Sequence, residues 1–347
     1  MGRTRRDAAL GLTMARVIRL NADEPMPVFA AGGVAPLDPV ERVRHAPDQH
    51  VMVEGDDGTL RARASCWWTA TPALPGERVG LVGHYAAADD ESAAAVLHDS
   101  CTALAQAGCS LAIGPMDGNT WRRYRWVIER GAAPPFFLEP DNPDTAPAQF
   151  VAAGFAELAT YTSAATEDLS QEDPRLGAAE TRLTRQGVRI RSLDAARADA
   201  ELSAIYRLSV EAFSDNYLYT PIEEAEFLEQ NVRVLPYVDP ELVLLAERGS
   251  ALVGYLFGVP DVLQRLRGEP VTTFIVKTVA VARGHGVSGL GSVLVGLAQS
   301  RAHGRGYTRA IHALMHESNV SRNISRRYAR TIRRYALFAR RLQPARA

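Results

Sequence analysis

Cysteine is scarce in this sequence, and the few cysteines do not form a motif. Cys66, Cys101 and Cys109 are an odd number, and none of them stands in a C-x-x-C pair. Neither a disulfide framework nor a structural zinc site follows from such a set. We therefore expect three small buried thiols in a reducing cytosol, and no metal.

Long apolar runs are absent as well. No run approaches the roughly 18 residues that a transmembrane helix needs, so a membrane is not an expected partner. Residues 1–20 contain several arginines but lack the apolar segment of a secretory signal. We expect residues 1–14 to be a disordered leader, and either Met1 or Met14 to be the translation start.

The chain also has almost no net charge. Its formal charge is −1, so whole-protein electrostatics gives no argument for nucleic acid. A basic tail follows Glu317, but it lacks the interleaved aromatic motifs of nucleic-acid-binding modules. Nucleic acid is therefore not an expected partner, and the oligomeric state stays open.

What the sequence does contain is a repeated order of elements, and 347 residues are enough for two domains. In the first half, the patterns predict strands at 50–54, 60–69 and 78–85, a helix from Asp89 to Gly108, a strand at 109–116, a helix capped by Asn119 or Thr120, and a closing segment at 150–163. In the second half, they predict strands at 188–192, 241–248, 251–260, 271–281 and 307–315, helices at 198–213, 222–232 and 290–303, and a tail that is helical to about Arg330 and extended afterwards. Residues 166–187 are polar and lack periodicity, which predicts a linker. The expected fold class is α+β, with units at 15–165 and 188–347.

A glycine-dense loop in the second half is the sharpest local feature. The strand ending in Val279-Ala280-Val281 runs into a loop with several glycines and then into an apolar helix. Glycines let backbone amides turn toward one point, and a helix N-terminus adds partial positive charge, so such a loop can hold a pyrophosphate. The Walker pattern is absent, and the dinucleotide fingerprint lacks its context. An ordinary glycine-rich turn is the alternative.

The segment from Lys277 to Gly304 resembles the acetyl-coenzyme A binding motif of the GCN5-related N-acetyltransferase (GNAT) superfamily. In that motif a V-x-V strand precedes R/Q-x-x-G-x-G/A and an amphipathic helix. Val279-Ala280-Val281 matches the strand, and Gly289-Leu290-Gly291 matches the G-x-G. Gly286 stands where Arg or Gln is expected, and Arg283 lies three residues earlier.

The resemblance covers residues 188–342 and implies two tandem domains, each with a mixed, mostly antiparallel sheet flanked by helices. It implies contacts with an acyl-coenzyme A, in the first place acetyl-coenzyme A, from Thr278, Val279, Ala280, Val281, Arg283, Gly286, Val287, Ser288, Gly289, Leu290, Gly291, Ser292 and Asn319. Backbone amides at 279–281 would align the pantetheine and donate to the thioester carbonyl. A splayed gap between the strands at Thr278 and His312 would admit the thioester.

The first half resembles the same superfamily in other segments. Residues 150–161 look like the late helix, Gly-Phe turn and strand of the family. Residues 86–91, however, contain no glycine and end in three carboxylates, which would repel a pyrophosphate. We therefore interpret the first half as a degenerate copy that does not bind coenzyme A. It would serve as scaffold or as the wall of an acceptor pocket, for which Arg125 and Glu139 are candidates.

Three residues are candidates for proton transfer: His316, Tyr328 and Lys277. His316, like His312, falls on or just after the strand that follows the loop helix, and a histidine suits a general base near neutral pH. A strand-end histidine bonded to backbone is the alternative. Tyr328 falls where the family often has a tyrosine acid, although its spacing from Asn319 departs from the family's. A packed aromatic is the alternative there.

Lys277 is the only lysine in an arginine-rich chain. A lone lysine suggests a place where a guanidinium does not serve. Our hypothesis is that its ammonium faces the cleft and binds an acceptor carboxylate or the coenzyme. Chance placement at an exposed strand end is the alternative.

Together these features predict an acyl-coenzyme A-dependent N-acyltransferase in which a small-molecule amine attacks the thioester directly. The alternatives are O-acyl transfer or other acyl-coenzyme A chemistry on the same fold. A binding protein that has lost coenzyme A is a further alternative.

Overall fold

A computed structural model describes residues 16–170, 174–284, 286–317 and 329–343 of the chain. The first half contains β1 (Arg16–Asn21), β2 (Ala30–Gly33), α1 (Pro39–His45), β3 (Gln49–Glu54), β4 (Thr59–Trp67), β5 (Val79–Ala87), α2 (Asp90–Gln106), β6 (Leu111–Gly114), β7 (Trp126–Glu129), α3 (Thr145–Ala152) and β8 (Ala156–Thr166). The second half contains α4 (Arg175–Arg185), β9 (Val188–Ser192), α5 (Ala198–Phe213), α6 (Glu224–Val232), β10 (Val243–Arg248), β11 (Ala251–Pro260), α7 (Leu263–Leu266), β12 (Thr273–Val281), α8 (Leu290–Gly304), β13 (Arg309–His316) and β14 (Arg330–Arg341). The fold is α+β, as the sequence predicts.

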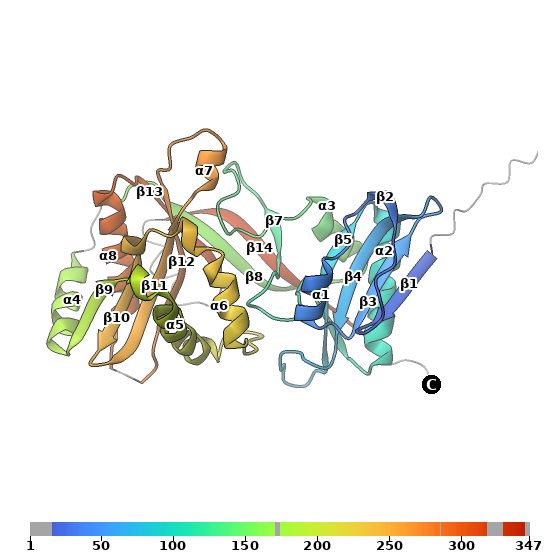
Figure 1. Cartoon of the computed structure of the whole chain (residues 1–347), viewed down its shortest axis with the longest axis horizontal. Helices are drawn as coiled ribbons and strands as arrows, with labels where there is room; N and C mark the ends of the chain where they lie inside the picture. Colours follow the sequence, from blue (N-terminus) through green and yellow to red (C-terminus); the bar gives the residue numbers. More distant parts are fainter. Residues whose placement is uncertain (1–15, 171–173, 285, 318–328, 344–347) are drawn as a thin grey trace, which may run out of the picture.

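All of these strands belong to one mixed, mostly antiparallel sheet. Its order is β1-β3-β4-β5-β6-β14-β8-β13-β12-β11-β10-β9, with β2 beside β4 and β7 beside β14. The described strands pair in parallel only between β5 and β6, β12 and β13, and β2 and β4. Helices cover the sheet in both halves, and β8 and β14 cross the middle of the molecule between them (Figure 1).

The two halves share their central strands. β14, the last described strand of the chain, lies between β6 and β8 of the first half, with Phe338 opposite Gly114 and Tyr335 opposite Tyr161. β8 in turn pairs with β13 of the second half, where Ala164 lies opposite His312. The boundaries at 15–165 and 188–347 remain a prediction. β14 of the second half lies between two strands of the first half, and β8 of the first half pairs with β13 of the second.

The apolar pattern explains where the core lies. Leu256, Leu290 and Leu294 have no exposed surface and join α8 to β11 in the second half. Phe150 is equally buried in the first half, where it packs against Phe338 of β14. The hydrophobic effect therefore holds β14 on the first half, although the sequence places it in the second.

Two expectations about local structure are wrong. Asn119 accepts the backbone N–H groups of Trp121 and Arg122 as a capping residue would, but turns and then β7 follow instead of a helix. Residues 166–187 are not aperiodic, because they contain α4, which packs its Leu176 against α8. That this segment links the two units remains a prediction. The strand expected after Arg330 is present, whereas the helix expected before it falls at 318–328, outside the described residues.

Two further features concern the thiols and the helices. Cys66, Cys101 and Cys109 are free and buried, and burial raises the pKa of each thiol. Among the described residues, no helix is both long and apolar enough to cross a bilayer.

Candidate active site

The sheet opens at one place in the second half. β12 and β13 pair in parallel only as far as Val276 and His312. Beyond that point the β13–β8 register shifts, and Leu314 adopts a φ of 58°. The Leu314 N–H is held by the Ser163 hydroxyl of β8 at 3.0 Å. The strand edges therefore diverge beside Lys277 and Thr278, as the splayed gap predicted from the sequence requires.

The glycine loop follows at the end of β12. Gly286 and Gly289 have φ values of 64° and 83°, a left-handed conformation that favours glycine. A Cβ at Gly286 would meet open space. Gly289 is the N-cap of α8. In the described residues, the first-turn amides of Gly291 and Ser292 have no backbone acceptor.

A cavity of about 680 Å³ lies against this loop. Its lining includes ten of the residues predicted to contact the coenzyme: Thr278, Val279, Val281, Gly286, Val287, Ser288, Gly289, Leu290, Gly291 and Ser292. Ala280 is instead buried in the core of the second half. Asn319 lies outside the described residues.

Arg283 does not reach toward this cavity. Its guanidinium pairs with Asp215 and donates to the Ala212 carbonyl at 3.1 Å, which ties it to the end of α5. Another guanidinium comes close: Arg182 of α4 donates to the Ser288 carbonyl at 2.8 Å. Sequence reasoning missed Arg182 because it lies in the segment interpreted as a linker. The spacing of Leu176, Leu183 and the arginines around them was the available signal for a helix.

A second cavity, of about 940 Å³, lies on the other side of the gap. Residues of both halves line it, including Trp121, Arg125 and Glu139 of the first half and Tyr217 and Phe227 of the second. The two cavities share five lining residues: Phe213, Lys277, Thr278, Ala313 and Leu314. Four of them stand where β12 and β13 diverge, and Phe213 is the last residue of α5, so the cavities meet at the gap in the sheet.

Lys277 is the ionisable group at this junction. Its Nζ donates to the Leu138 carbonyl at 3.0 Å. Burial, together with the nearby Arg125 charge, lowers the pKa of Lys277 to about 7, and Glu139 opposes the shift only in part. A lysine with this pKa is available as a neutral amine near neutral pH.

The histidines are divided between the two cavities. His316 lines the larger one, with its ring 4.9 Å from that of Tyr161 and 5.8 Å from that of Tyr217, and burial lowers its pKa. His312 lines the smaller one, beside the Gln299 amide nitrogen at 3.0 Å, and burial lowers its pKa to about 4. Tyr328 lies outside the described residues. The structure thus brings Lys277 and His316 to one cavity, with Lys277 at the junction.

The described part of the chain contains no cluster of three or more His, Cys, Asp or Glu side chains that could hold a metal ion.

The equivalent places in the first half are filled by the chain itself. The Asp89 carboxylate accepts the Ser92 N–H at the start of α2 and pairs with Arg61. β5 and β6 pair only to Leu81 and Ile113, but residues 115–117 enter the space beyond. A Cβ at Gly83 would lie 2.2 Å from the Met116 carbonyl oxygen.

Comparisons with known proteins bear on this fold. No protein-family model matches the sequence. A bacterial ceramide synthase of Caulobacter vibrioides is 27% identical over 190 residues, which cover 53% of this chain and 48% of that protein. The chain thus aligns with about half the length of that curated relative.

Solved structures extend the comparison to nearly the whole chain. A conserved protein of unknown function from Enterococcus faecalis V583, described as a probable N-acyltransferase, matches with a TM-score of 0.51 at 11% identity, over 96% of this chain and 74% of that one. The chain therefore shares its fold with this probable N-acyltransferase. A tandem GNAT protein from the clavulanic acid biosynthesis pathway matches with a TM-score of 0.46 at 14% identity, over 96% of this chain and 100% of that one. The fold shared with the probable N-acyltransferase agrees with the mixed, mostly antiparallel sheet that the GNAT resemblance implies.

Proposed function

We propose that this protein is an acyl-coenzyme A-dependent N-acyltransferase. The observation that carries the proposal is the junction of two cavities at a gap in the sheet. The smaller cavity, against the glycine loop, would hold the coenzyme, and the larger one would hold an amine. Lys277, Thr278, Ala313 and Leu314 line both cavities, so the acyl carbon and the attacking nitrogen would meet between them.

The glycine loop fits the pyrophosphate of the coenzyme. The Gly291 and Ser292 amides at the α8 N-terminus have no backbone acceptor in the described residues, and the α8 dipole favours an anion there. Arg182 adds a positive charge beside Ser288. These groups compensate for the glycine that stands at position 286 where the family has Arg or Gln. The bound coenzyme supplies an activated thioester.

The β12 edge beside the gap would position the thioester. β11 occupies the other edge of β12, where Thr278 lies opposite Phe257 and Val279 opposite Leu256. Within the described ranges, the edge toward β13 has no strand pairing beyond Val276. Backbone amides there would align the pantetheine and donate to the thioester carbonyl, where negative charge develops during attack.

Lys277 would act as the general base. An amine acceptor is an ammonium ion in water, and it must lose a proton before nitrogen attacks carbon. Lys277 stands at the junction with a pKa of about 7, so its neutral form can take that proton. His316 is the second candidate base, because it lines the same larger cavity. A general acid at Tyr328 remains a prediction.

The name of the curated relative suggests a concrete acceptor. A ceramide is the amide of a fatty acid with a long-chain amino alcohol. The larger cavity has about 940 Å³ and an aromatic wall that includes Trp121, Tyr217 and Phe227, so it offers room for an apolar chain. A long-chain amino alcohol with a fatty acyl-coenzyme A is therefore tested beside small amines with acetyl-coenzyme A.

Calorimetric titration with acetyl-coenzyme A and with palmitoyl-coenzyme A tests the proposal first. We expect micromolar binding of at least one of them, followed by release of the free coenzyme thiol when amines are added. Absence of binding by both would contradict the proposal and favour a binding protein that has lost coenzyme A. Thiol release with alcohols but not with amines would favour O-acyl transfer.

A further inference from the structure

Arg125 is an unusual residue in the larger cavity. Its side chain lines that cavity, although the residue is only 7% exposed. The guanidinium lies between two aromatic rings, 4.0 Å from the centroid of Tyr124 and 4.2 Å from that of Tyr161. Its backbone has a φ of 65°, a left-handed conformation that arginine rarely adopts. The fold therefore holds this cation in a fixed place at the cavity wall.

The hydrogen-bonding capacity of Arg125 is largely unused. One nitrogen, Nη1, donates to the Leu314 carbonyl at 3.3 Å. Nε is buried and has no hydrogen-bond partner within the described part of the chain. No described carboxylate lies within ion-pair distance of this guanidinium. A buried guanidinium without a carboxylate is costly unless an anion from outside neutralises it.

The carboxylates around this cavity each have a cation of their own. Glu139 pairs with Arg333 at 2.8 Å, and Asp141 pairs with Arg130 at 2.7 Å. Asp215, as described above, pairs with Arg283. None of these acids is left to neutralise Arg125.

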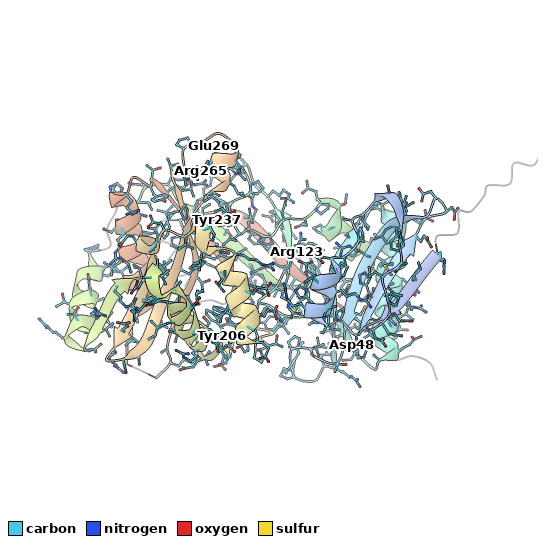
Figure 2. The ribbon with its side chains drawn as sticks, in the orientation of Figure 1. Asp48, Arg123, Tyr206, Tyr237, Arg265 and Glu269 are labelled. Atoms are coloured by element: carbon cyan, nitrogen blue, oxygen red, sulfur yellow. The ribbon has the colours of Figure 1, made fainter. Side chains whose placement is uncertain are left out.

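The other bases at the wall are placed differently. Arg122 pairs with Glu226 at 2.6 Å. Arg123 is exposed and lies between the two halves, where it donates to the Asp141 backbone carbonyl (Figure 2). His316 has a lowered pKa, so it contributes no fixed positive charge at neutral pH. Arg125 is thus the permanent buried cation of this wall, with Lys277 near enough to feel its charge.

We propose that the larger cavity binds an acceptor that carries a negatively charged group, a carboxylate or a phosphate, in addition to its amine, and that Arg125 binds this group. The inference rests on the proposed function and deepens it by naming the substrate class. The planar guanidinium matches both anions, and its stacking between Tyr124 and Tyr161 fixes its orientation. An anion at Arg125 would also favour proton uptake by Lys277.

Matched pairs of amines test this in the wild-type protein, with the acyl-coenzyme A that binds. One pair is phenylalanine and 2-phenylethylamine, which differ by a carboxylate. The other is sphinganine 1-phosphate and sphinganine, which differ by a phosphate. We expect kcat/KM at least about tenfold higher for the anionic member of one pair, and the pair that discriminates identifies the anion. Equal or better use of both neutral members overturns the proposal and leaves the proposed function intact.

Substitution locates the discrimination at Arg125. In Arg125→Gln the preference for the anionic member is expected to disappear. Because this substitution also removes a charge that lowers the pKa of Lys277, the readout is the ratio of kcat/KM between the two members of a pair at one pH, in which a change common to both members cancels. Arg125→Lys is expected to restore part of it. Arg265→Gln is the matched control, because it removes an exposed arginine of α7 that does not line the larger cavity and lies away from Arg123 (Figure 2). An unchanged preference in folded Arg125→Gln also overturns the proposal, and if that variant fails to fold, the wild-type comparison decides.

A binding measurement separates this inference from the proposed function. Quenching of Trp121, which lines the cavity, is followed with phenylacetate and with 2-phenylethanol as its neutral counterpart. Binding of phenylacetate that is lost in Arg125→Gln supports the anion site even if no amine is acylated. Dodecyl phosphate is the corresponding probe for a phosphate group. If no amine is acylated, and neither phenylacetate nor dodecyl phosphate binds, the anion site is refuted together with the proposed function.

Discussion

The starts of α8 and α2 show how one fold produces an open site in one half and a closed one in the other. The N-cap of α8 is Gly289, with a φ of 83°, and it makes no side-chain cap hydrogen bond. The first-turn amides of Gly291 and Ser292 have no backbone acceptor in the described residues. α2 begins at Asp89, whose carboxylate already accepts the Ser92 N–H. The same helix dipole is therefore offered to a ligand in one half and satisfied internally in the other.

The sheet shows the same difference. Beyond Val276 the gap between β12 and β13 opens into both cavities. Beyond Leu81 the gap between β5 and β6 is filled by residues 115–117, and the Asp117 carboxylate accepts the His84 N–H at 2.6 Å. The backbone arrangement is thus not sufficient for a ligand site. What decides is whether local side chains and loops already occupy its polar groups.

The largest expected effect is a loss of stability when the buried ion pair between Glu139 of the first half and Arg333 of β14 is broken. Glu139 and Arg333 form an ion pair with side chains only 2% and 1% exposed, and the Tyr335 hydroxyl also donates to Glu139. Glu139→Gln would leave a buried guanidinium unpaired, so we expect the free energy of unfolding to fall by about 3–5 kcal/mol. Urea denaturation measures it.

The matched control uses Arg334, the neighbour of Arg333 on β14. Glu129 pairs with Arg334, but these side chains are 58% and 39% exposed. Solvent screens such a pair, so Glu129→Gln should cost less than about 1 kcal/mol. Similar losses in the two variants would show that burial of the Glu139 pair is not what joins the halves.

The next largest effect is expected at Lys277, which directly follows the last residue of β12 that pairs with β13. The residue that directly follows the last residue of β5 paired with β6 is the buried Val82. If Lys277 is the base, Lys277→Gln should lower kcat by about 100-fold or more. The base must be neutral, and its pKa is about 7, so wild-type kcat/KM should rise with pH through about 7 and then level off. The variant should lose this rise.

Lys277→Arg separates a base from a fixed charge. Arginine keeps the positive charge and a donor for the Leu138 carbonyl, but it does not release a proton in this pH range. A base role predicts that it is as impaired as Lys277→Gln. Full turnover in Lys277→Arg would assign the residue a purely electrostatic role and make His316 the leading candidate base.

Local patterns predicted much of this fold. Strand alternation and turn residues placed β3, β4, β9, β10 and β11, because those elements are fixed by nearby side chains. The glycines predicted a loop that can hold a pyrophosphate, since left-handed conformations are a local requirement, and the smaller cavity lies against this loop. The GNAT resemblance then predicted the gap between β12 and β13.

Long-range pairing could not be predicted in the same way. β14 lies beside β6 and β8, more than 150 residues earlier in the chain, and no local pattern specifies that choice. Two arginines show the same limit: Arg283 was expected to contact the coenzyme, and Arg182 was not considered. Arg283 pairs with Asp215 of a distant segment, and Arg182 reaches the loop only because α4 packs on α8. The larger cavity depends on both halves, so single residues such as Arg125 and Glu139 could be named as candidates, but not the cavity that they line together.

A substitution at the open helix start should remove the difference between the halves. Gly289→Glu places a side chain in a left-handed backbone, where its Cβ would lie 3.2 Å from Arg182 Nη2. It also adds a carboxylate at the start of α8, where we propose that the pyrophosphate of the coenzyme binds. We expect about 100-fold weaker binding of acetyl-coenzyme A, or about 2.7 kcal/mol, by calorimetry.

Gly249→Glu controls for the backbone strain alone. Gly249 has a φ of 62° and open space around its Cβ position, in the turn between β10 and β11. The Gly249→Glu variant should therefore be less stable than the wild type but bind the coenzyme with unchanged affinity. Unchanged affinity in Gly289→Glu would mean that the coenzyme does not bind at the α8 start.

The smallest expected effect is at the closed helix start. Asp89→Ala removes the N-cap of α2 and should lower the free energy of unfolding by about 1 kcal/mol in a thermal or urea experiment. Asp144→Ala is its matched control, since Asp144 precedes α3 without making a side-chain cap hydrogen bond. Coenzyme binding should change in neither variant, because the gap beside α2 stays filled by residues 115–117.

The pH dependence tests the cause of the Asp89 effect. Although burial acts in the opposite direction, the Ser92 hydrogen bonds and the Arg61 pair lower the pKa of Asp89 in the folded state. Its contribution is therefore present above the pKa of the unfolded chain and is lost as pH falls through the lower, folded value. The stability difference between wild type and Asp89→Ala should shrink in acid. A difference that persists in acid would show that packing, rather than the ionised cap, is what the aspartate supplies, and the electrostatic part of the contrast between α2 and α8 would then rest on Gly289 alone.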